Sequence, residues 1–300
     1  VVESLGEMIE LARRSGAPVH ISHFMLAGKG NWGKTAEVLS KIDEARASGG
    51  DITFDQYPYM AANPYLRSML PPWMHEGGIE ATLARLGEAS LRERAAQEME
   101  EGVPGWESIA KDAGWENLVV LSEKLSELSG RSLREIAASH RKELADTVFD
   151  LLLQDPEAPL IAHWLDEDDV RTIMRHHCQM VSSDSSEPGP LAHPRTYGTF
   201  PRIFGEYVRT QGVLSWEEAV RKTSNFAARR FGLDRRGMIL DGWHADLVVL
   251  DPDTVGARAT YNEPDRYPLG IEYVIVNGAI VVEGAEHNGR LHGRVLARHS

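Results

Sequence analysis

Along the first part of the chain, stretches with helical spacing of apolar positions alternate with short runs typical of strands. Apolar residues recur three or four positions apart until Gly16 and Pro18 end the first predicted helix. A strand is predicted over 18–24, a helix over 35–47 and a second strand over 51–57. A strand, a helix and a strand within about forty residues are typical of a βαβ unit, so the two strands should be parallel neighbours.

This alternation breaks between residues 61 and 155. Proline-rich turns lead into two long helical patterns, over roughly 79–101 and 131–153, which we interpret as an insertion. The α/β pattern then resumes, with a strand predicted over 160–164, a helix over 166–176, a strand over 179–184 and a helix over 215–230.

The last part of the chain has patterns typical of antiparallel strands. Strands are predicted over 245–251 and 271–282, and the dipeptide Asn277-Gly278 indicates a hairpin turn within the second. We therefore predict an α/β domain over 1–235, with its insertion at about 61–155, and a small β domain over 236–300.

Composition limits the partners that the chain could take. Asp and Glu outnumber Lys and Arg by 45 to 32, a net charge of −13, which argues against nucleic acid and anionic membranes. No apolar run approaches the roughly 20 residues of a membrane span. The single cysteine, Cys178, cannot form an internal disulfide, so we expect a cytoplasmic protein. Because Val1 is not an initiator methionine, we expect the chain to begin within a longer protein.

Polar side chains that could carry chemistry end three of the predicted strands. His23 ends the first, Asp55 and Tyr57 end the second, and Asp184 ends the strand over 179–184. Functional groups gather at the carboxyl ends of parallel strands, and zinc takes imidazole and carboxylate ligands. These residues therefore suggest a zinc site. A hydrogen-bonded core histidine and a helix-capping aspartate remain the alternative at this point.

Five other residues are assigned from their positions alone. Arg195, on a loop rich in proline and glycine, could bind a carboxylate with two hydrogen bonds, or could simply be a surface arginine. His20 precedes His23 by three positions, so it should face the helices and be structural. Cys178 is interpreted as buried packing, and His176 and His177 as cations that complement a helix dipole.

Several strings in this sequence belong to a familiar pattern. They are HISHF at 20–24, GNWGK at 30–34, DQYPY at 55–59, LPPW at 70–73, Ser183-Asp184, HPRTYGTFP at 193–201, GWHADLVVLDP at 242–252 and VNG at 276–278. Together they resemble the N-acyl-D-amino-acid deacylases, or D-aminoacylases, of the amidohydrolase superfamily, nearly from end to end.

The resemblance implies a fold and a reaction. The expected fold is α/β, comprising the later strands of a zinc-dependent (β/α)8 TIM barrel with an inserted helical lid after Tyr59, plus part of a small β-sandwich. The expected reaction is zinc-dependent hydrolysis of the amide bond of N-acyl-D-amino acids, which releases a D-amino acid and a carboxylate. The expected partner is therefore this small molecule.

The resemblance also assigns roles to five residues. His23 resembles a metal-ligand histidine, and Asp184 resembles an aspartate that binds metal and acts as general acid and base. Arg195 resembles the residue that pairs with the substrate carboxylate. Tyr57 and Asn63 are assigned to substrate binding, with Tyr57 contacting the substrate or the developing oxyanion.

Two departures from the family pattern leave other interpretations open. Met25 stands where the family usually has a lysine, and the family's amino-terminal metal ligands have no counterpart and should precede Val1. The chain thus resembles the carboxyl-terminal portion of the enzyme and, by itself, should hold zinc at this site weakly or not at all. The alternatives are a non-catalytic chain with an incomplete metal shell and an amidohydrolase that acts on another amide.

Overall fold

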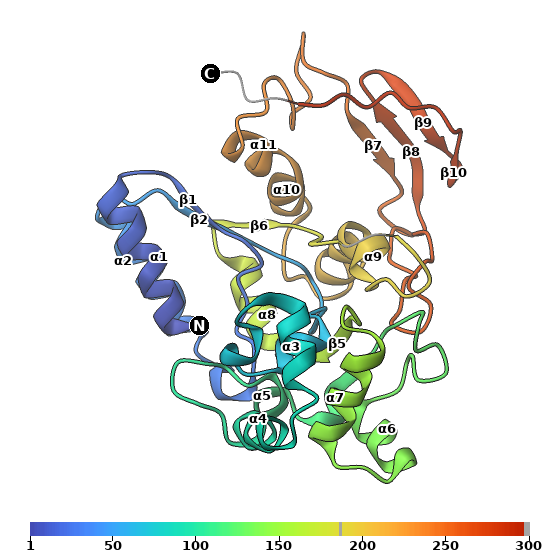
Figure 1. Cartoon of the computed structure of the whole chain (residues 1–300). Helices are drawn as coiled ribbons and strands as arrows, with labels where there is room; N and C mark the ends of the chain where they lie inside the picture. Colours follow the sequence, from blue (N-terminus) through green and yellow to red (C-terminus); the bar gives the residue numbers. More distant parts are fainter. Residues whose placement is uncertain (186–187, 297–300) are drawn as a thin grey trace. The chain divides into compact units, whose positions relative to one another are not determined.

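The computed structural model describes residues 1–185 and 188–296, so the last four residues of the predicted 236–300 segment lie outside it (Figure 1). The chain divides into two compact units. The helical unit consists of Leu26–Lys34 and Tyr59–Asp169, with Val1. The sheet unit consists of Val2–Met25, Thr35–Pro58 and Val170–Ser300.

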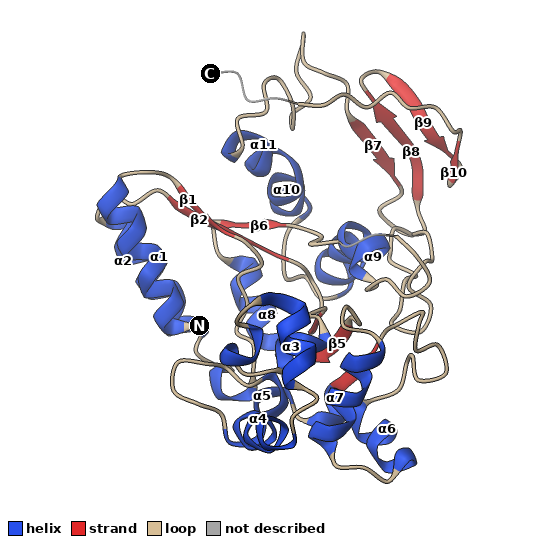
Figure 2. Ribbon diagram, viewed as in Figure 1, coloured by secondary structure: helices blue, strands red, loops and turns tan. Residues whose placement is uncertain are grey.

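A short parallel sheet lies in the sheet unit (Figure 2). Its strands are β1 (Val19–Ile21), β2 (Ile52–Gln56) and β6 (Gln179–Val181), in the order β1-β2-β6. All of β2 is buried, as is typical of the central strand of a sheet covered on both faces. The predicted parallel pairing of the first two strands is confirmed.

The two amino-terminal helices follow the predicted pattern. α1 (Val2–Ser15) packs against β1, and α2 (Thr35–Ala47) packs against β2 and α1. Leu5 of α1 and Val38 and Ile42 of α2 are buried, because apolar residues three or four positions apart share one face of a helix.

Two of the parallel strands end earlier than predicted. The strand over 18–24 ends at Ile21, and the strand over 179–184 ends at Val181. His23 and Asp184 have φ of 40° and 45°, outside the range of a β-strand, so the backbone turns before each of them. Both candidate metal ligands therefore lie on turns that follow strands.

The remaining helices of the sheet unit follow the parallel strands. They are α9 (Arg195–Arg202), the π-helix η5 (Ile203–Thr210), α10 (Trp216–Val220), the π-helix η6 (Arg221–Asn225) and α11 (Phe226–Arg230). The predicted helix over 215–230 is thus one helical stretch with a π segment in its middle, and π segments often occur at functional positions.

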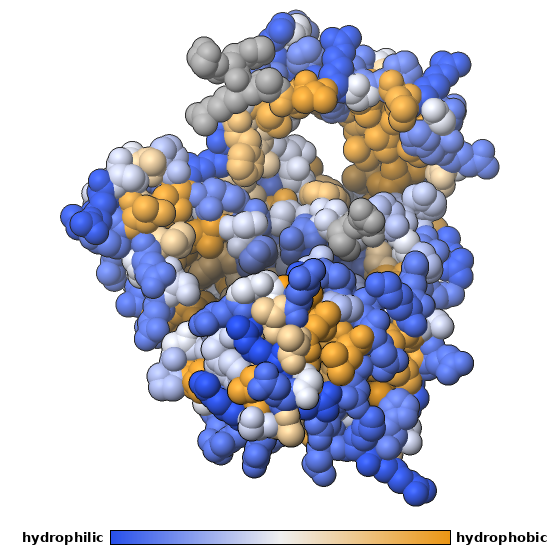
Figure 3. Space-filling view, viewed as in Figure 1, coloured by the Kyte–Doolittle hydropathy of each residue, from blue (hydrophilic) through white to orange (hydrophobic). Residues whose placement is uncertain are grey.

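Four antiparallel strands form the carboxyl-terminal sheet. They are β7 (Leu247–Leu250), β8 (Ile271–Val276), β9 (Ala279–Glu283) and β10 (Glu286–His287), in the order β10-β9-β8-β7. Asn277 and Gly278 have φ of 48° and 84°, which confirms the predicted hairpin turn. Apolar side chains on these strands are exposed, including 57% of Val248 and 46% of Val249 (Figure 3).

The helical unit contains the predicted insertion. Its elements are η1 (Lys29–Asn31), β3 (Ala61–Ala62), η2 (Leu66–Met69), η3 (Pro72–His75), α3 (Gly78–Arg85), α4 (Ala89–Glu101), α5 (Ile109–Ala113), η4 (Trp115–Asn117), β4 (Leu118–Val120), α6 (Leu133–His140), α7 (Leu144–Gln154) and β5 (Leu160–His163). α8 (Glu167–Arg175) crosses the boundary between the units.

Several predicted elements of this region differ in detail. The helix over 79–101 is divided into α3 and α4, because Glu88 has extended backbone angles. The helix over 131–153 is divided into α6 and α7 at Arg141, whose φ is 55°. The predicted strand over 160–164 is present as β5, but it pairs antiparallel with β3 and β4 and not with the parallel sheet.

The helices of the described residues are too short or too polar to cross a membrane.

Candidate functional site

The carboxylate of Asp55, near the end of β2, binds groups from β1 and from the turns after β1 and β6. Oδ1 accepts hydrogen bonds from the backbone N–H of His23, at 2.8 Å, and from the hydroxyl of Ser182, at 2.7 Å. Oδ2 lies 2.8 Å from Nε2 of His20. Because β1 and β6 flank β2, one carboxylate holds three chain segments in place at this end of the sheet.

These contacts also determine the charge of Asp55. Burial by itself raises the pKa of this carboxyl group, but hydrogen bonds from His20, the backbone of His23 and Ser182 outweigh burial and lower the pKa below its ordinary value. Asp55 is therefore ionised at neutral pH, which makes it an acceptor for all three donors.

The contacts of His20 agree with the structural role predicted for it. The prediction assumed a strand that continues to residue 24, however, and β1 ends at Ile21. Nδ1 of His20 lies 2.8 Å from the hydroxyl of Thr53, its Nε2 contacts Asp55, and its ring packs edge-on against Phe231. His23 lies beyond β1 on a turn, so alternation along a strand does not relate the two side chains. His23 itself is exposed.

Asp184 and Arg195 form an ion pair in the sheet unit. The Arg195 Nη1 atom lies 2.8 Å from Oδ2 of Asp184. Arg195 is the first residue of α9 and is only 6% exposed, so it is neither the loop residue nor the surface arginine considered from the sequence. The structure thus brings together two residues that the sequence assigned to different roles.

Tyr57 lies against the same guanidinium. The Arg195 Cζ atom is 4.6 Å from the centre of the Tyr57 ring, a cation–π contact. Burial raises the pKa of Tyr57 to about 12, despite the opposing effect of Arg195. The phenol therefore stays protonated and can donate a hydrogen bond. His193 packs near the Tyr57 ring, at 6.2 Å between centroids.

Within the described residues, Arg195 has a further feature that points to a ligand. Its Nε atom is buried and has no hydrogen-bond partner there. A buried N–H without a partner costs free energy, so such groups commonly await a ligand or water. Within the described residues, the Nε edge of the guanidinium thus carries a donor whose hydrogen bond is not satisfied.

Asn63 belongs to the helical unit, whereas His23, Tyr57, Asp184 and Arg195 belong to the sheet unit. The Asn63 side-chain amide donates a 2.6 Å hydrogen bond to the carbonyl oxygen of Leu160. This bond braces β5 within its own unit, so the described contacts of Asn63 are structural.

The two predicted metal ligands follow strands that are separated by β2. Adjacent strands lie about 4.8 Å apart, so their ends are roughly 10 Å from one another and the side chains must reach inward to share an ion. Among the described residues, three metal-ligating side chains come together only at His176, His177 and Cys178.

The structure corrects the role predicted for His176 and confirms the burial of Cys178. α8 ends before His176, and burial lowers the pKa of this imidazole, so it is predominantly neutral at pH 7 and is not a cation at a helix end. Cys178 is 1% exposed, as predicted.

Sequence reasoning placed Asp55 at a strand end but missed its partners. His20 and Ser182 are far from Asp55 in sequence, and only the strand order brings them to one carboxylate. The available signal was the predicted pairing of the strands over 18–24 and 51–57, which places His20 and Asp55 on neighbouring strands.

Comparisons with known proteins agree with these motifs. At 34% identity over 298 residues, the chain matches the D-aminoacylase of Alcaligenes xylosoxydans xylosoxydans, and at 31% over 297 residues it matches the N-acyl-D-aspartate deacylase of the same organism. The matches cover 99% of this chain but 52% and 51% of those relatives. The chain therefore spans about half the length of the curated relatives it matches.

Solved structures give the same result. A crystal structure of D-aminoacylase is 34% identical to this chain, with a TM-score of 0.78. The alignment covers 99% of this chain and 53% of the D-aminoacylase chain. The N-acyl-D-glutamate deacylase of Bordetella bronchiseptica, solved with zinc and a phosphonate inhibitor, has 30% identity and a TM-score of 0.76, covering 97% and 52%. The resemblance to D-aminoacylases is confirmed, and because the amidohydrolase family model matches residues 3–282, the chain belongs to the amidohydrolase family.

Proposed function

We propose that this chain supplies the substrate-binding and proton-transferring part of a zinc-dependent enzyme that hydrolyses the amide bond of N-acyl-D-amino acids. The observation that carries the proposal is the contact of Asp184, Arg195 and Tyr57 in one unit. A carboxylate that can take a proton, a cation with an open edge and a neutral phenol are what hydrolysis of an N-acylated acid requires. The similarity to deacylases supports the substrate class.

The donor chemistry of two residues fits part of a zinc site. His23 offers an imidazole and Asp184 a carboxylate, both on exposed turns after parallel strands, and zinc takes both ligand types. Asp55 accepts a hydrogen bond from the backbone N–H of His23 and so fixes the position of the backbone from which the imidazole extends. When bound, zinc would polarise the amide carbonyl and lower the pKa of water.

The chain's own residues then have distinct tasks. Asp184 accepts the proton of the attacking water and returns it to the leaving amine. The Nε edge of Arg195 binds the α-carboxylate of the substrate and sets its orientation. The protonated phenol of Tyr57 donates a hydrogen bond to the substrate or to the oxygen on which negative charge develops.

The ion pair between Asp184 and Arg195 links binding to proton transfer. A substrate carboxylate at the Nε edge would leave the Nη1 contact with Asp184 in place, so one guanidinium would hold the substrate beside the group that transfers the proton. Met25, at the family's lysine position, is buried and uncharged, so Arg195 would carry most of the carboxylate recognition.

For the fold, we propose that 1–235 belong to a TIM barrel with its insertion at 61–155, and that 236–300 belong to a small β-sandwich. The parallel order β1-β2-β6 and the antiparallel carboxyl-terminal sheet support this division. A cytoplasmic location and the absence of nucleic-acid partners remain predictions from composition.

A second candidate is a chain that binds a carboxylate without catalysis. It is favoured because the described residues bring no third metal-ligating side chain together with both His23 and Asp184. A third candidate, an amidohydrolase of cyclic amides, has no need for the open edge of Arg195.

The deciding experiment measures hydrolysis by the intact protein of an N-acetyl-D-amino acid, its L enantiomer and a cyclic amide. We expect hydrolysis of the D substrate, loss of activity after chelation and recovery with zinc. Activity on the cyclic amide alone would favour the third candidate. Carboxylate binding without hydrolysis, in protein supplied with excess zinc, would favour the second.

A further inference from the structure

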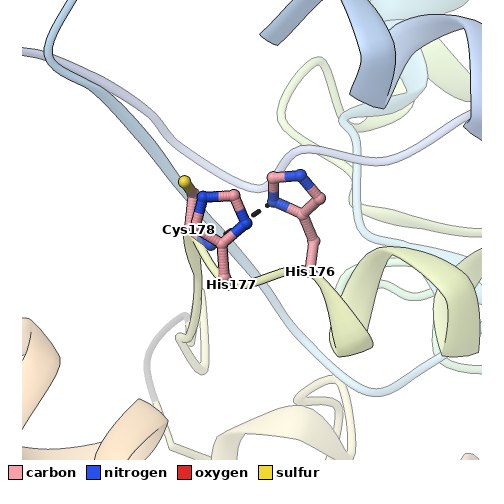
Figure 4. Close-up of side chains that lie close together, drawn as sticks. All are labelled: His176, His177 and Cys178. Carbon is pink, nitrogen blue, oxygen red and sulfur yellow. Dashed lines mark hydrogen bonds between the residues drawn. The ribbon is translucent and has the colours of Figure 1, made fainter. Parts of the chain in front are cut away.

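A second group of metal-ligating side chains lies at the opposite end of β6 from Asp184. His176, His177 and Cys178 form the turn between α8 and β6, and one ligand atom from each lies within 4.8 Å of the others (Figure 4). The group therefore precedes the strand, whereas the candidate active site follows it. The proposed hydrolysis makes no use of these three residues.

The backbone of this turn is held by two cations from η6. Lys222 Nζ donates to the carbonyl oxygens of His176, at 2.6 Å, and Gln179, at 3.1 Å. Arg221 Nη2 donates to the carbonyl oxygen of His177 at 3.1 Å. Three carbonyls in four residues are thus fixed, so the turn does not have to be ordered when a ligand binds.

The ring of His176 is oriented by a carboxylate. Its Nε2 atom lies 3.1 Å from Oδ1 of Asp43 on α2, and its Nδ1 accepts a long 3.3 Å hydrogen bond from the backbone N–H of Cys178. With Nε2 donating to Asp43, the lone pair of Nδ1 faces the backbone N–H of Cys178, so a metal on Nδ1 must displace this long hydrogen bond. In metal sites, the ring nitrogen of a ligating histidine that does not bind the metal commonly donates a hydrogen bond to a carboxylate, which fixes the orientation of the ring.

The thiol of Cys178 is not activated for nucleophilic attack. Burial raises its pKa, and Asp43 acts in the same direction, while Arg46, Lys222 and Arg221 oppose it. Without a metal the sulfur is therefore protonated and unreactive. The three cations stabilise a thiolate once it forms, although they also repel a dication.

We propose that His176, His177 and Cys178 bind a thiophilic divalent cation of the Zn²⁺ class, with water as the fourth ligand. The thiol loses its proton to solvent as the metal–sulfur bond forms. Ligand atoms around zinc lie about 3.3–3.7 Å apart, so the group must contract by at most about 1.5 Å, which the exposed ring of His177 allows. Imidazole and thiolate ligands favour zinc over magnesium or calcium.

The test uses Co²⁺ as a spectroscopic substitute for Zn²⁺. A cobalt–thiolate bond produces an absorption band in the near ultraviolet that imidazole and carboxylate ligands do not produce. We expect the band in the wild-type protein, its loss on addition of Zn²⁺, and its absence in Cys178→Ser. Because Cys178 is the single cysteine of this sequence, the difference between wild type and variant isolates this site.

Three further variants make the outcome specific. His177→Ala removes an exposed ligand with little risk to folding and should abolish stoichiometric binding. Asp43→Ala should weaken binding about 10–100-fold and retain the band at saturation. His140→Ala, an exposed histidine at the end of α6, is the matched control and should change nothing.

His23→Ala separates this proposal from the proposed function. It should remove hydrolysis and retain the thiolate band. Circular dichroism establishes that each variant is folded. The proposal is overturned if folded wild-type protein gives no band, or if the band is unchanged in His177→Ala.

Discussion

The backbone N–H of His23 donates a 2.8 Å hydrogen bond to the carboxylate of Asp55. His23 is a non-glycine residue with φ of 40°, a conformation that needs support from its surroundings. The same carboxylate accepts the hydroxyl of Ser182, two residues before Asp184, which also has positive φ. Asp55 is therefore a positioning residue for both predicted metal ligands.

We expect Asp55→Asn to destabilise the protein by about 1–3 kcal/mol at neutral pH, because a buried acceptor of three hydrogen bonds becomes a partial donor. The pKa of Asp55 is lowered in the folded protein, so its contribution is fully present above the unfolded value, near 3.9, and is lost as pH falls through the folded value. Urea unfolding between pH 3 and 7 measures this difference.

The difference in unfolding free energy between wild type and Asp55→Asn should therefore be largest at pH 5–7 and shrink below about pH 4. Asp51→Asn, at the exposed start of the same region, is the control and should have a small effect. A difference that is constant across this pH range would contradict the charge assigned to Asp55.

In the intact enzyme, Asp184→Asn should nearly abolish turnover and leave the fold intact. The amide of asparagine cannot take a proton and ligates metal poorly, and general acid–base catalysis contributes about 10²–10⁴-fold. Steady-state hydrolysis of an N-acetyl-D-amino acid measures the loss, with Asp251→Asn as the control. A variant that retained near-wild-type kcat would show that another group transfers the proton.

Arg195→Lys should lower kcat/KM for the acid substrate. The corresponding loss of transition-state stabilisation should be on the order of 1.5–3 kcal/mol, because lysine cannot form two parallel hydrogen bonds to a carboxylate. Zinc content should not change. A methyl ester of the substrate, which lacks the carboxylate, should be affected little. Arg202→Lys on the same helix is the control, and equal losses for acid and ester would count against the assignment.

Tyr57→Phe should lower kcat by about 10²–10³-fold if the phenol donates to the developing oxyanion. Because the pKa of Tyr57 is about 12, the pH–rate profile of the wild type should show no loss attributable to this phenol below about pH 11. Rates measured from pH 6 to 10.5 test both points. Tyr207→Phe, another buried tyrosine, serves as the control, and a matching loss there would indicate a general packing effect.

We expect the 300-residue chain to self-associate through β7, the edge strand of the carboxyl-terminal sheet. Val248 and Val249 on β7 are 57% and 46% exposed, and exposed apolar strands at a sheet edge pair with other chains. Sedimentation velocity should show species larger than a monomer. Val248→Lys should shift the distribution toward the monomer, whereas a monodisperse wild-type monomer would exclude this prediction.

The sequence by itself determined the elements whose signals are local. The helical spacing of Leu5, Val38 and Ile42, and the Asn277-Gly278 turn, each depend on residues within a few positions of one another. The family motifs are local strings too, so the amidohydrolase family could be identified before any contact was known. Local patterns did overextend two strands, because they do not report the positive φ of His23 and Asp184.

Only the tertiary structure decided which of these residues meet. Asp55 and Ser182 are 127 positions apart, and Arg195, at the start of α9, pairs with Asp184 on the turn after β6. The same applies to Asp43, which reaches His176 across 133 positions. Such contacts depend on strand order and on packing between distant segments, which the spacing of apolar residues along the chain does not encode.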